Sequence, residues 1–260
     1  MEVNVYSAEG KPVKRIKLPD IFQTEIRPDV IGRVVRAIQS ARRQPYGPDE
    51  MAGKRTTAEP WGKGYGVSRV PRGKGTRYPA AGMAGFVPHA VGGRRAHPPR
   101  PEKKLVEKVN KKEKRLAIKS AISATKEMRL VKTRGHVLNG VPELPLVVTD
   151  DIESMTSAKD VIRFLKAVGV WKDVERVIKG TKIRSGRGKM RGRRYKTPVG
   201  PLIVVKEDRG ITKGARNIPG VSVSTVAGLN AELLAPGGVP GRLTIWTEGA
   251  IAQLAEGRFA

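Results

Sequence analysis

The sequence contains no cysteine, so the protein has neither disulfide bonds nor thiolate metal sites. Aromatic residues make up only 5%, and Asp and Glu number 24 against 51 Lys and Arg, which leaves a net charge of +27. A compact chain with this imbalance repels itself and requires an anionic partner. With 38% apolar residues the chain can bury a core, but not along its whole length.

No segment has the features of a targeting or membrane-spanning sequence. The N-terminus, MEVNVYSAEGKPVKRIKLP, has no apolar core and no small-residue cleavage site, and so predicts no signal peptide. No apolar run reaches the roughly 20 residues that a transmembrane helix needs. We therefore expect a nucleic-acid partner inside the cell and no membrane partner.

Sequence motifs for nucleotide binding and nucleophilic catalysis are missing as well. There is no Walker A motif, the GKGYG stretch at Gly62 follows no predicted strand, and no serine lies in a nucleophile elbow. Asp150 and Asp151 follow a predicted strand, where α/β enzymes often place acids, but without a partner motif we assign them to a turn and the start of a helix. We predict no metal site and no cofactor, because the histidines lack the spacing of metal ligands and a supporting carboxylate. They are His89, His97 and His136.

Periodic apolar patterns begin at the N-terminus. Residues 2–6 alternate like an edge strand. Residues 28–42 have the apolar spacing of a helix, with Pro28 at its start and Asp29 in its first turn. Residues 102–128 predict a second helix, which is basic except for a thin apolar stripe. The stripe consists of Leu105, Val109, Leu116, Ala117 and Ala121, and the basic residues expected to bind RNA are Lys108, Lys112, Arg115 and Lys119.

From residue 142 onward, strand and helix patterns alternate. Buried strands are expected within residues 144–151, 201–208, 220–228 and 241–248, and helices at 157–169 and 248–257. Ser157 and Asp160 are spaced as a capping box. The alternation predicts an α/β fold, with a largely parallel sheet and helices on its faces. We expect one globular α/β domain over residues 1–260, interrupted by an extended loop at 44–100.

Residues 44–100 carry no helical periodicity, and from Arg69 to Pro101 there is no alternation typical of a strand. Irregular stretches of this length are uncommon in compact domains unless they are functional or disordered. Basic side chains and rings that can stack on unpaired bases recur among the glycines and prolines, a composition suited to RNA with loops and clefts. We therefore expect this loop to fold against its partner along one specific path. The expected RNA contacts are Trp61, Lys63, Tyr65, Arg69, Arg72, Lys74, Arg77, Tyr78, Arg94, Arg95 and Arg100, with Phe86 as a further ring.

A second basic segment runs from Ile178 to Lys196 and contains no acidic residue. Its glycines let backbone amides approach phosphate closely, and its arginines add bidentate donors that also stack on bases. Such a run of like charge would destabilise itself without counter-charge, so we favour contact with a polyanion over a solvated surface loop. The residues expected to make this contact are Lys182, Arg184, Arg187, Lys189, Arg191, Arg193, Arg194 and Lys196.

These segments resemble one known family, the archaeal and eukaryotic branch of the universal large-subunit ribosomal protein L-four. The sequence KIRSGRGKMRGRRY at 182–195, preceded by GVWKDVERVIKGTK, is similar to the signature region of that family. Residues 59–101 resemble its long internal extension, and the segments KVNKKEKRLAIKSAISAT and LPLVVTDDIES also fit. The resemblance covers nearly the whole chain.

The resemblance implies a structural protein on the outside of the large ribosomal subunit, in the cytoplasm, and not an enzyme. It implies that the long loop threads through large-subunit ribosomal RNA to the wall of the nascent-peptide exit tunnel. The implied partners are this RNA, neighbouring large-subunit proteins and, near the loop tip, the nascent peptide. The tip implied to lie near the tunnel consists of Arg72, Gly73, Lys74, Gly75, Thr76, Arg77 and Met83.

Two alternatives stay open on the residues alone. A basic architectural protein that binds RNA or DNA outside the ribosome would have a similar charge, although the glycine- and proline-rich loop argues against compaction of duplex DNA. An RNA-acting enzyme would use Asp150 and Asp151 with a metal ion. Such an enzyme would show metal-dependent turnover that is lost in an Asp150→Asn variant.

Overall fold

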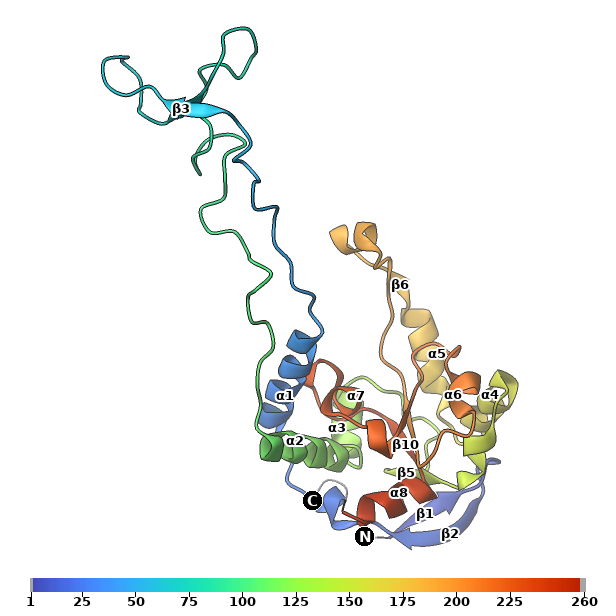
Figure 1. Cartoon of the computed structure of the whole chain (residues 1–260). Coiled ribbons are helices and arrows are strands. Elements are labelled where there is room, and N and C mark those ends of the chain that lie inside the picture. Colours follow the sequence, from blue (N-terminus) through green and yellow to red (C-terminus); the bar gives the residue numbers. More distant parts are fainter. Residues whose placement is uncertain (1, 258–260) are drawn as a thin grey trace. The chain divides into compact units, whose positions relative to one another are not determined.

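The structure is a computed structural model that describes residues 2–257, and the chain divides into two compact units. The larger unit combines the chain up to Ser40 with the chain from Glu107 onward, and the smaller unit is Ala41–Val106. Figure 1 shows both units, which are described separately below.

The larger unit is built on a six-stranded sheet with the strand order β2-β1-β5-β10-β8-β9. The strands are β1 (Glu2–Tyr6), β2 (Pro12–Lys17), β5 (Leu146–Val148), β8 (Leu202–Val205), β9 (Ser222–Thr225) and β10 (Thr244–Thr247). Every neighbouring pair is parallel except β1 and β2, which are antiparallel. The predicted α/β fold with a largely parallel sheet is therefore confirmed.

Helices cover both faces of the sheet, which places one apolar core on each side (Figure 1). Successive strand residues alternate between the cores: Trp246 belongs to one, and its neighbour Ile245 to the other. The ring of Phe22 meets that of Trp246 edge to face, with 5.5 Å between centroids. The first core is covered by α1 (Pro28–Ala41), α2 (Lys111–Ala124), α7 (Ala231–Leu234) and α8 (Glu248–Ala255), and the second by α3 (Met128–Thr133), α4 (Ala158–Ala167), α5 (Trp171–Gly180) and α6 (Ile211–Ala215).

Helices α1, α4 and α8 each have a polar side chain engaged at the N-cap or in the first turn. At the start of α1, the carboxylate of Asp29 accepts a hydrogen bond from Arg27 (2.8 Å), which lowers the pKa of Asp29 to about 2. Ser157 caps α4 by accepting from the amide of Lys159, although Asp160 does not complete a capping box. Thr247 caps α8 by accepting from the amide of Ala250. Within residues 2–257, no helix is long and apolar enough to cross a membrane.

Two predictions about single elements are wrong. Strand β1 is not an edge strand, because β2 pairs with its outer side. The β2 sequence PVKRIK is mostly exposed and charged, so it carries no apolar alternation that would reveal a strand. The helix predicted at 102–128 is restricted to α2, which starts after Asn110 and leaves Leu105 and Val109 outside it. Basic residues favour helix before Asn110, but Leu105, Val106 and Val109 are the only apolar residues there, which is too little apolar surface to stabilise a further helical turn.

The smaller unit contains a small antiparallel sheet of β3 (Ala58–Pro60) and β4 (Pro71–Gly73). Two backbone hydrogen bonds connect the other side of β4 to residues 83–85. The amide of Gly73 donates to the carbonyl of Met83 (3.0 Å), and the amide of Gly85 donates to the carbonyl of Pro71 (2.9 Å). The expectation of no strand between Arg69 and Pro101 is therefore wrong. Gly73 is the only buried residue in Ala41–Val106, all of which the structure describes, so this sheet has no side-chain core beneath it.

Candidate nucleic-acid interface

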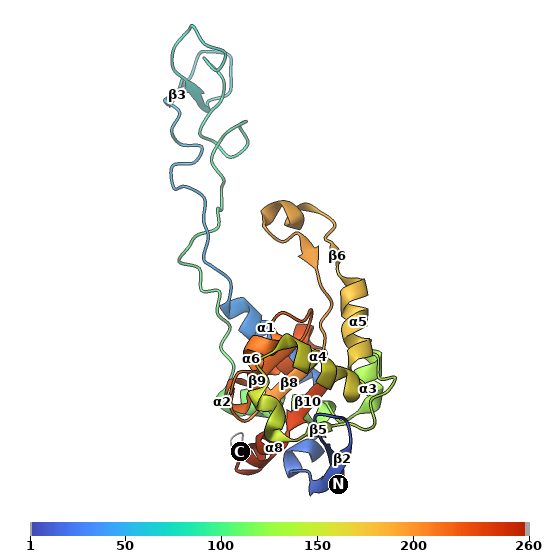
Figure 2. The ribbon, with the colours of Figure 1, turned by 90° about the vertical axis from the view of Figure 1, so that its right-hand side faces the viewer.

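The basic segment 182–196 forms a hairpin that continues from the end of α5, as both views show (Figures 1 and 2). Its strands β6 (Lys182–Ile183) and β7 (Tyr195–Lys196) pair in antiparallel fashion, and the 3-10 helix η3 (Arg187–Arg191) forms the turn. Gly192 ends η3 in the left-handed conformation (φ 77°), which a residue with a side chain adopts at a cost. The backbone therefore fixes a compact shape for the segment.

All eight basic residues predicted for this segment lie on the hairpin, and every one except the half-buried Arg184 is exposed. Within residues 2–257, none of the eight forms an ion pair with an acidic side chain. Arg184 instead donates to the carbonyls of Arg193 (3.2 Å) and Tyr195 (3.4 Å), which links the two limbs of the hairpin. Seven unpaired positive charges on so short a segment favour a polyanionic partner.

The hairpin also exposes apolar side chains among its charges. Ile183 and Tyr195 are direct cross-strand partners, and both are more than half exposed. The guanidinium of Arg194 lies 5.7 Å from the centre of the Tyr195 ring. An exposed ring that is flanked by cations suits a nucleobase, which can stack on the ring while its phosphate meets the charge.

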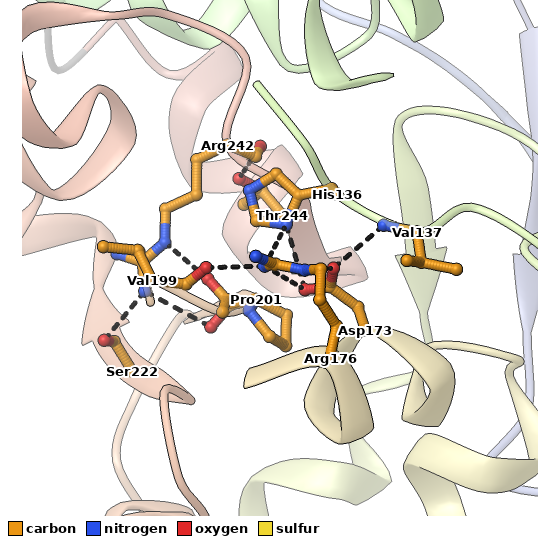
Figure 3. Close-up of polar contacts among 10 residues, drawn as sticks. His136, Val137, Asp173, Arg176, Val199, Pro201, Ser222, Arg242 and Thr244 are labelled. Carbon is orange, nitrogen blue, oxygen red and sulfur yellow. Dashed lines mark hydrogen bonds and ion pairs between the residues drawn. The ribbon is translucent and has the colours of Figure 1, made fainter. Parts of the chain in front are cut away.

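A buried polar network holds the base of the hairpin (Figure 3). Oδ2 of Asp173, in the first turn of α5, accepts a hydrogen bond from Nδ1 of His136 (2.9 Å), and Oδ1 accepts from the amide of Val137 (2.9 Å). Arg176 donates to Asp173 (2.8 Å) and also to the carbonyl of Val199 (2.8 Å), on the returning limb. Burial by itself would raise the pKa of Asp173, but the hydrogen bonds from His136 and Arg176 outweigh it and leave this pKa below its usual value.

Arg242 holds the next part of the returning limb. Its buried guanidinium donates to the carbonyl of Gly200 (2.9 Å), to that of Leu233 (2.9 Å) and to the hydroxyl of Ser222 (2.9 Å). Burial, with a further contribution from the positive charge of Arg134, lowers the pKa of Arg242 to about 10. Arg242 therefore stays charged at neutral pH, and its bonds join the hairpin base to the sheet and α7.

This anchoring network was not predicted from the sequence. His136 was expected to lack a supporting carboxylate, and that expectation is wrong, because Asp173 lies beside it. The two residues are 37 positions apart, so no local spacing reveals the pair. The one available signal was an acidic residue, Asp173, between apolar positions near the start of a helix.

In the smaller unit, three of the predicted RNA-binding residues form a stack. The rings of Trp61 and Tyr65 lie 5.6 Å apart, and the guanidinium of Arg72 lies 5.5 Å from the Trp61 ring. Arg72 also donates to the carbonyl of Gly82 (2.9 Å), so part of its hydrogen-bonding capacity is used within the unit. Trp61 and Tyr65 remain exposed and can accept a base.

The predicted tip, Arg72–Met83, is a closed loop adjoining β4. The ammonium of Lys74 pairs with Glu59, and the hydroxyl of Tyr78 donates to the carbonyl of Lys74. Most of the other predicted contacts in this unit are exposed, while Arg94 is half-buried and lies 6.0 Å from the ring of Phe86. The exposed ones are Lys63, Arg69, Arg77, Arg95 and Arg100.

The predicted basic residues near the second helix are only partly brought together. Lys112, Arg115 and Lys119 follow one another at helical spacing along α2, away from its buried face of Ala117 and Ala121. Lys112 and Arg115 are exposed and Lys119 is half-buried. Lys108 lies before the helix begins and is exposed. The first three therefore form one basic helical face.

The two acids considered for catalysis have structural roles. Oδ1 of Asp150 accepts from the amide of Gly249 (2.7 Å), in the first turn of α8, and Oδ2 of Asp151 accepts from the hydroxyl of Thr149 (3.0 Å). Asp151 thus bonds within its own turn, whereas Asp150 reaches the distant start of α8. Both acids lie in the first turn of the 3-10 helix η2 (Asp150–Ser154), in agreement with the predicted turn and helix roles. Among residues 2–257, no group of three or more His, Asp or Glu side chains is arranged to hold a metal ion.

Comparison with known proteins gives a consistent result. Residues 16–257 match the model of the ribosomal protein L4/L1 family. Proteins named large ribosomal subunit protein uL4 are similar over 98% of this chain: those of Methanopyrus kandleri (52% identity, 98% of that protein), Methanosphaera stadtmanae (52%, 96%) and Archaeoglobus fulgidus (51%, 99%). The chain belongs to the ribosomal protein L4/L1 family.

Proposed function

We propose that the protein binds large-subunit ribosomal RNA through the 182–196 hairpin, the basic face of α2 and the smaller unit. As a member of this family, the protein is a structural component of the large ribosomal subunit and not an enzyme. Like its archaeal relatives, it is located in the cytoplasm. Ribosomal RNA and other large-subunit proteins are its partners in that setting. The residues that touch the RNA are our proposal.

The observation that carries the proposal is the hairpin. Eight Lys and Arg residues between Lys182 and Lys196 face no acid, yet Asp173, Arg176 and Arg242 hold the base of the segment in place. A preorganised cation cluster loses less entropy on binding phosphates than a flexible tail would. The hairpin is therefore the main anchor in this proposal.

We assign the smaller unit to a path within the RNA. Ala41–Val106 contains 14 Lys and Arg against 4 Asp and Glu, and only one glycine is buried. A segment of this kind gains its packing from a partner and not from itself. On the implied family architecture, the loop at 72–83 reaches the exit-tunnel wall and meets the nascent peptide.

Occupancy of ribosomal subunits tests the anchoring role. Tagged wild-type protein and an Arg187→Ala/Arg191→Ala/Arg194→Ala variant would be expressed in an archaeal host, and their amounts on gradient-purified large subunits measured after a moderate-salt wash. The wild type should comigrate with large subunits and the triple variant should be depleted. Wild-type protein that sediments away from large subunits would instead favour an architectural role outside the ribosome.

A loop replacement tests the tunnel assignment separately. Exchanging Gly75–Pro79 for five Gly and Ser residues leaves the hydrogen bonds of Gly73 and Gly85 in place. Subunit occupancy should stay close to wild type, while the response to stalling peptides or tunnel-binding antibiotics should change. Normal responses at normal occupancy would place the loop away from the tunnel wall.

A further inference from the structure

A pocket of about 580 Å³ lies at the base of the hairpin, and Tyr195 is part of its lining. The end of α5 forms one side, β7 forms another, and the turn between α6 and β9 forms the third. Gly220 allows this turn to approach: its φ is 76°, and a Cβ there would lie 2.6 Å from a methyl group of Val177. The pocket size falls in the range of small-ligand sites, roughly 300–1,000 Å³.

The walls of the pocket are mainly apolar and contain one aromatic ring. Ile178 is 47% exposed and Tyr195 is 58% exposed, although both line a hollow in which a ligand could cover them. Ile218 is almost fully buried and contributes to the lining from the α6–β9 turn. Large apolar side chains left open beside a strongly basic hairpin indicate a ligand that is both flat and anionic.

Two exposed polar side chains at the pocket have no partner in the described part of the chain. Within residues 2–257, neither the guanidinium of Arg216 nor the side-chain amide of Asn217 forms a hydrogen bond or an ion pair. An amide both donates and accepts, which matches the edge of a nucleobase, and a guanidinium matches a phosphate. The α6–β9 turn therefore presents a pair of groups suited to a nucleotide.

We infer that this pocket holds one unpaired RNA nucleotide, with its base against Tyr195 and Ile178, the base edge at Asn217 and a phosphate at Arg216. The inference rests on the proposed binding of ribosomal RNA and adds a base-specific site to it. A nucleotide in a duplex would keep its base stacked between its neighbours and away from the ring, so the occupant is a bulged or loop nucleotide.

The basic surroundings favour RNA over a protein ligand. Lys179, Lys182 and Lys196 adjoin the lining residues in the sequence, and Arg194 lies against Tyr195. Within residues 2–257, no acidic side chain lines the pocket. The complementary ligand is therefore anionic, and a ring that is flanked by a guanidinium binds a base by stacking.

Binding to protein-free large-subunit rRNA of Archaeoglobus fulgidus tests the inference with four variants. Tyr195→Leu should weaken binding about five- to 150-fold, because one stacked base is lost, whereas Tyr195→Phe should bind like wild type. Asn217→Ala should weaken binding by up to about tenfold. None of the three uncharged changes should alter the salt dependence, whereas Arg216→Ala should reduce the slope of log affinity against log salt by roughly 0.7–0.9.

Ultraviolet cross-linking of the same complexes locates the contact. Wild-type protein should cross-link to a nucleotide through residues 195–197 or 216–221. The inference would be overturned if Tyr195→Leu and Tyr195→Phe bound the rRNA with equal affinity. It would also be overturned if solvent exposure of Tyr195 fell on addition of a poly-glutamate peptide but not on addition of the rRNA. If the wild type shows no salt-dependent affinity for the rRNA at all, the proposed function itself fails, a result distinct from failure of the pocket alone.

Discussion

The imidazole Nδ1 of His136 lies 2.9 Å from Oδ2 of Asp173, and both side chains are buried at the base of the basic hairpin. Asp173 also accepts from Arg176, which in turn donates to the carbonyl of Val199 on the returning limb. A single carboxylate thus links the segment around His136 to the helix that leads into the hairpin and, through Arg176, to the segment that follows the hairpin. We conclude that this network determines where the hairpin is held.

Replacing Asp173 by Asn should strongly destabilise the protein. The neutral amide cannot accept from His136, Arg176 and the Val137 amide together, so buried donors and a positive charge lose their partner. The free energy of unfolding should fall by about 3–5 kcal/mol, as for other broken buried ion pairs. Urea denaturation checks this, with Asp160→Asn as the control, because Asp160 is half exposed and pairs with Arg163 at 3.7 Å. A loss as small as that of the control would contradict the network's role.

The same carboxylate should contribute to acid denaturation. Its pKa in the folded protein lies below the usual value, so the unfolded state binds the proton more readily. The stabilisation is then fully present above the ordinary carboxyl pKa of about 4 and is lost as the pH falls through the lower, folded-state value. Unfolding free energies measured between pH 7 and pH 2 should fall less steeply in Asp173→Asn than in wild type. If the unfolding free energies of the two proteins fell equally with pH, protonation of Asp173 would not be linked to unfolding.

Arg242→Ala should also destabilise the larger unit, for a different reason. The substitution leaves the buried carbonyls of Gly200 and Pro201 without this donor, together with the partly buried carbonyl of Leu233 and hydroxyl of Ser222. Unpaired buried acceptors cost about 1–3 kcal/mol each, so we expect a loss of at least about 2 kcal/mol. Thermal unfolding checks this against Arg209→Ala, which removes only an exposed pair with Glu207 (3.4 Å). Similar melting temperatures for the two variants would be incompatible with an anchoring role for Arg242.

Amide hydrogen exchange should separate the two units in the free protein. Only Gly73 is buried in Ala41–Val106, so water reaches nearly all of its backbone hydrogen bonds, whereas strands β5, β8 and β10 are buried throughout. Residues 44–100 should exchange quickly in the free protein and become protected on rRNA. If the amides of Arg69–Arg95 were strongly protected from exchange without RNA, the smaller unit would not depend on RNA for its packing.

Most strands of the larger unit and its helices α1, α4 and α8 were predictable because they bury regular apolar patterns, whereas α3, α5, α6 and α7 were not predicted. Runs such as LIVV at Leu202–Val205 and the stripe around Phe164 are visible without tertiary context. Strand β2 was missed because its face is charged and exposed, and its pairing with β1 depends on the chain reversal between them. The helix at 102–128 was predicted too long because helix-favouring residues continue beyond the buried face.

The basic residues of the proposed interface are recognisable in the sequence, but the contacts that support them are not. A cluster such as Arg187–Arg191 is visible in composition alone, since no acid lies among its neighbours. The contacts of Asp173 and Arg242 join positions many residues apart, and Arg216 and Asn217 line the same pocket as Tyr195 only because of the fold. Such long-range pairings follow from tertiary packing and have no local periodicity.

The salt dependence of RNA binding tests the central claim, that hairpin cations neutralise rRNA phosphates. Affinity for protein-free large-subunit rRNA would be measured across a range of salt concentrations for wild type and for Arg187→Ala/Arg191→Ala/Arg194→Ala. A matched control removes three arginines already paired with acids, in Arg27→Ala/Arg33→Ala/Arg163→Ala. Both variants lose the same charge, so a difference between them reports position and not net charge.

Each phosphate contact contributes roughly 0.7–0.9 to the slope of log affinity against log salt, so the hairpin variant should lose about 2–3 from the wild-type slope. The control variant should keep nearly the whole slope. An unchanged slope in the hairpin variant, or an equal loss in the control, would contradict the assignment of the hairpin to the RNA.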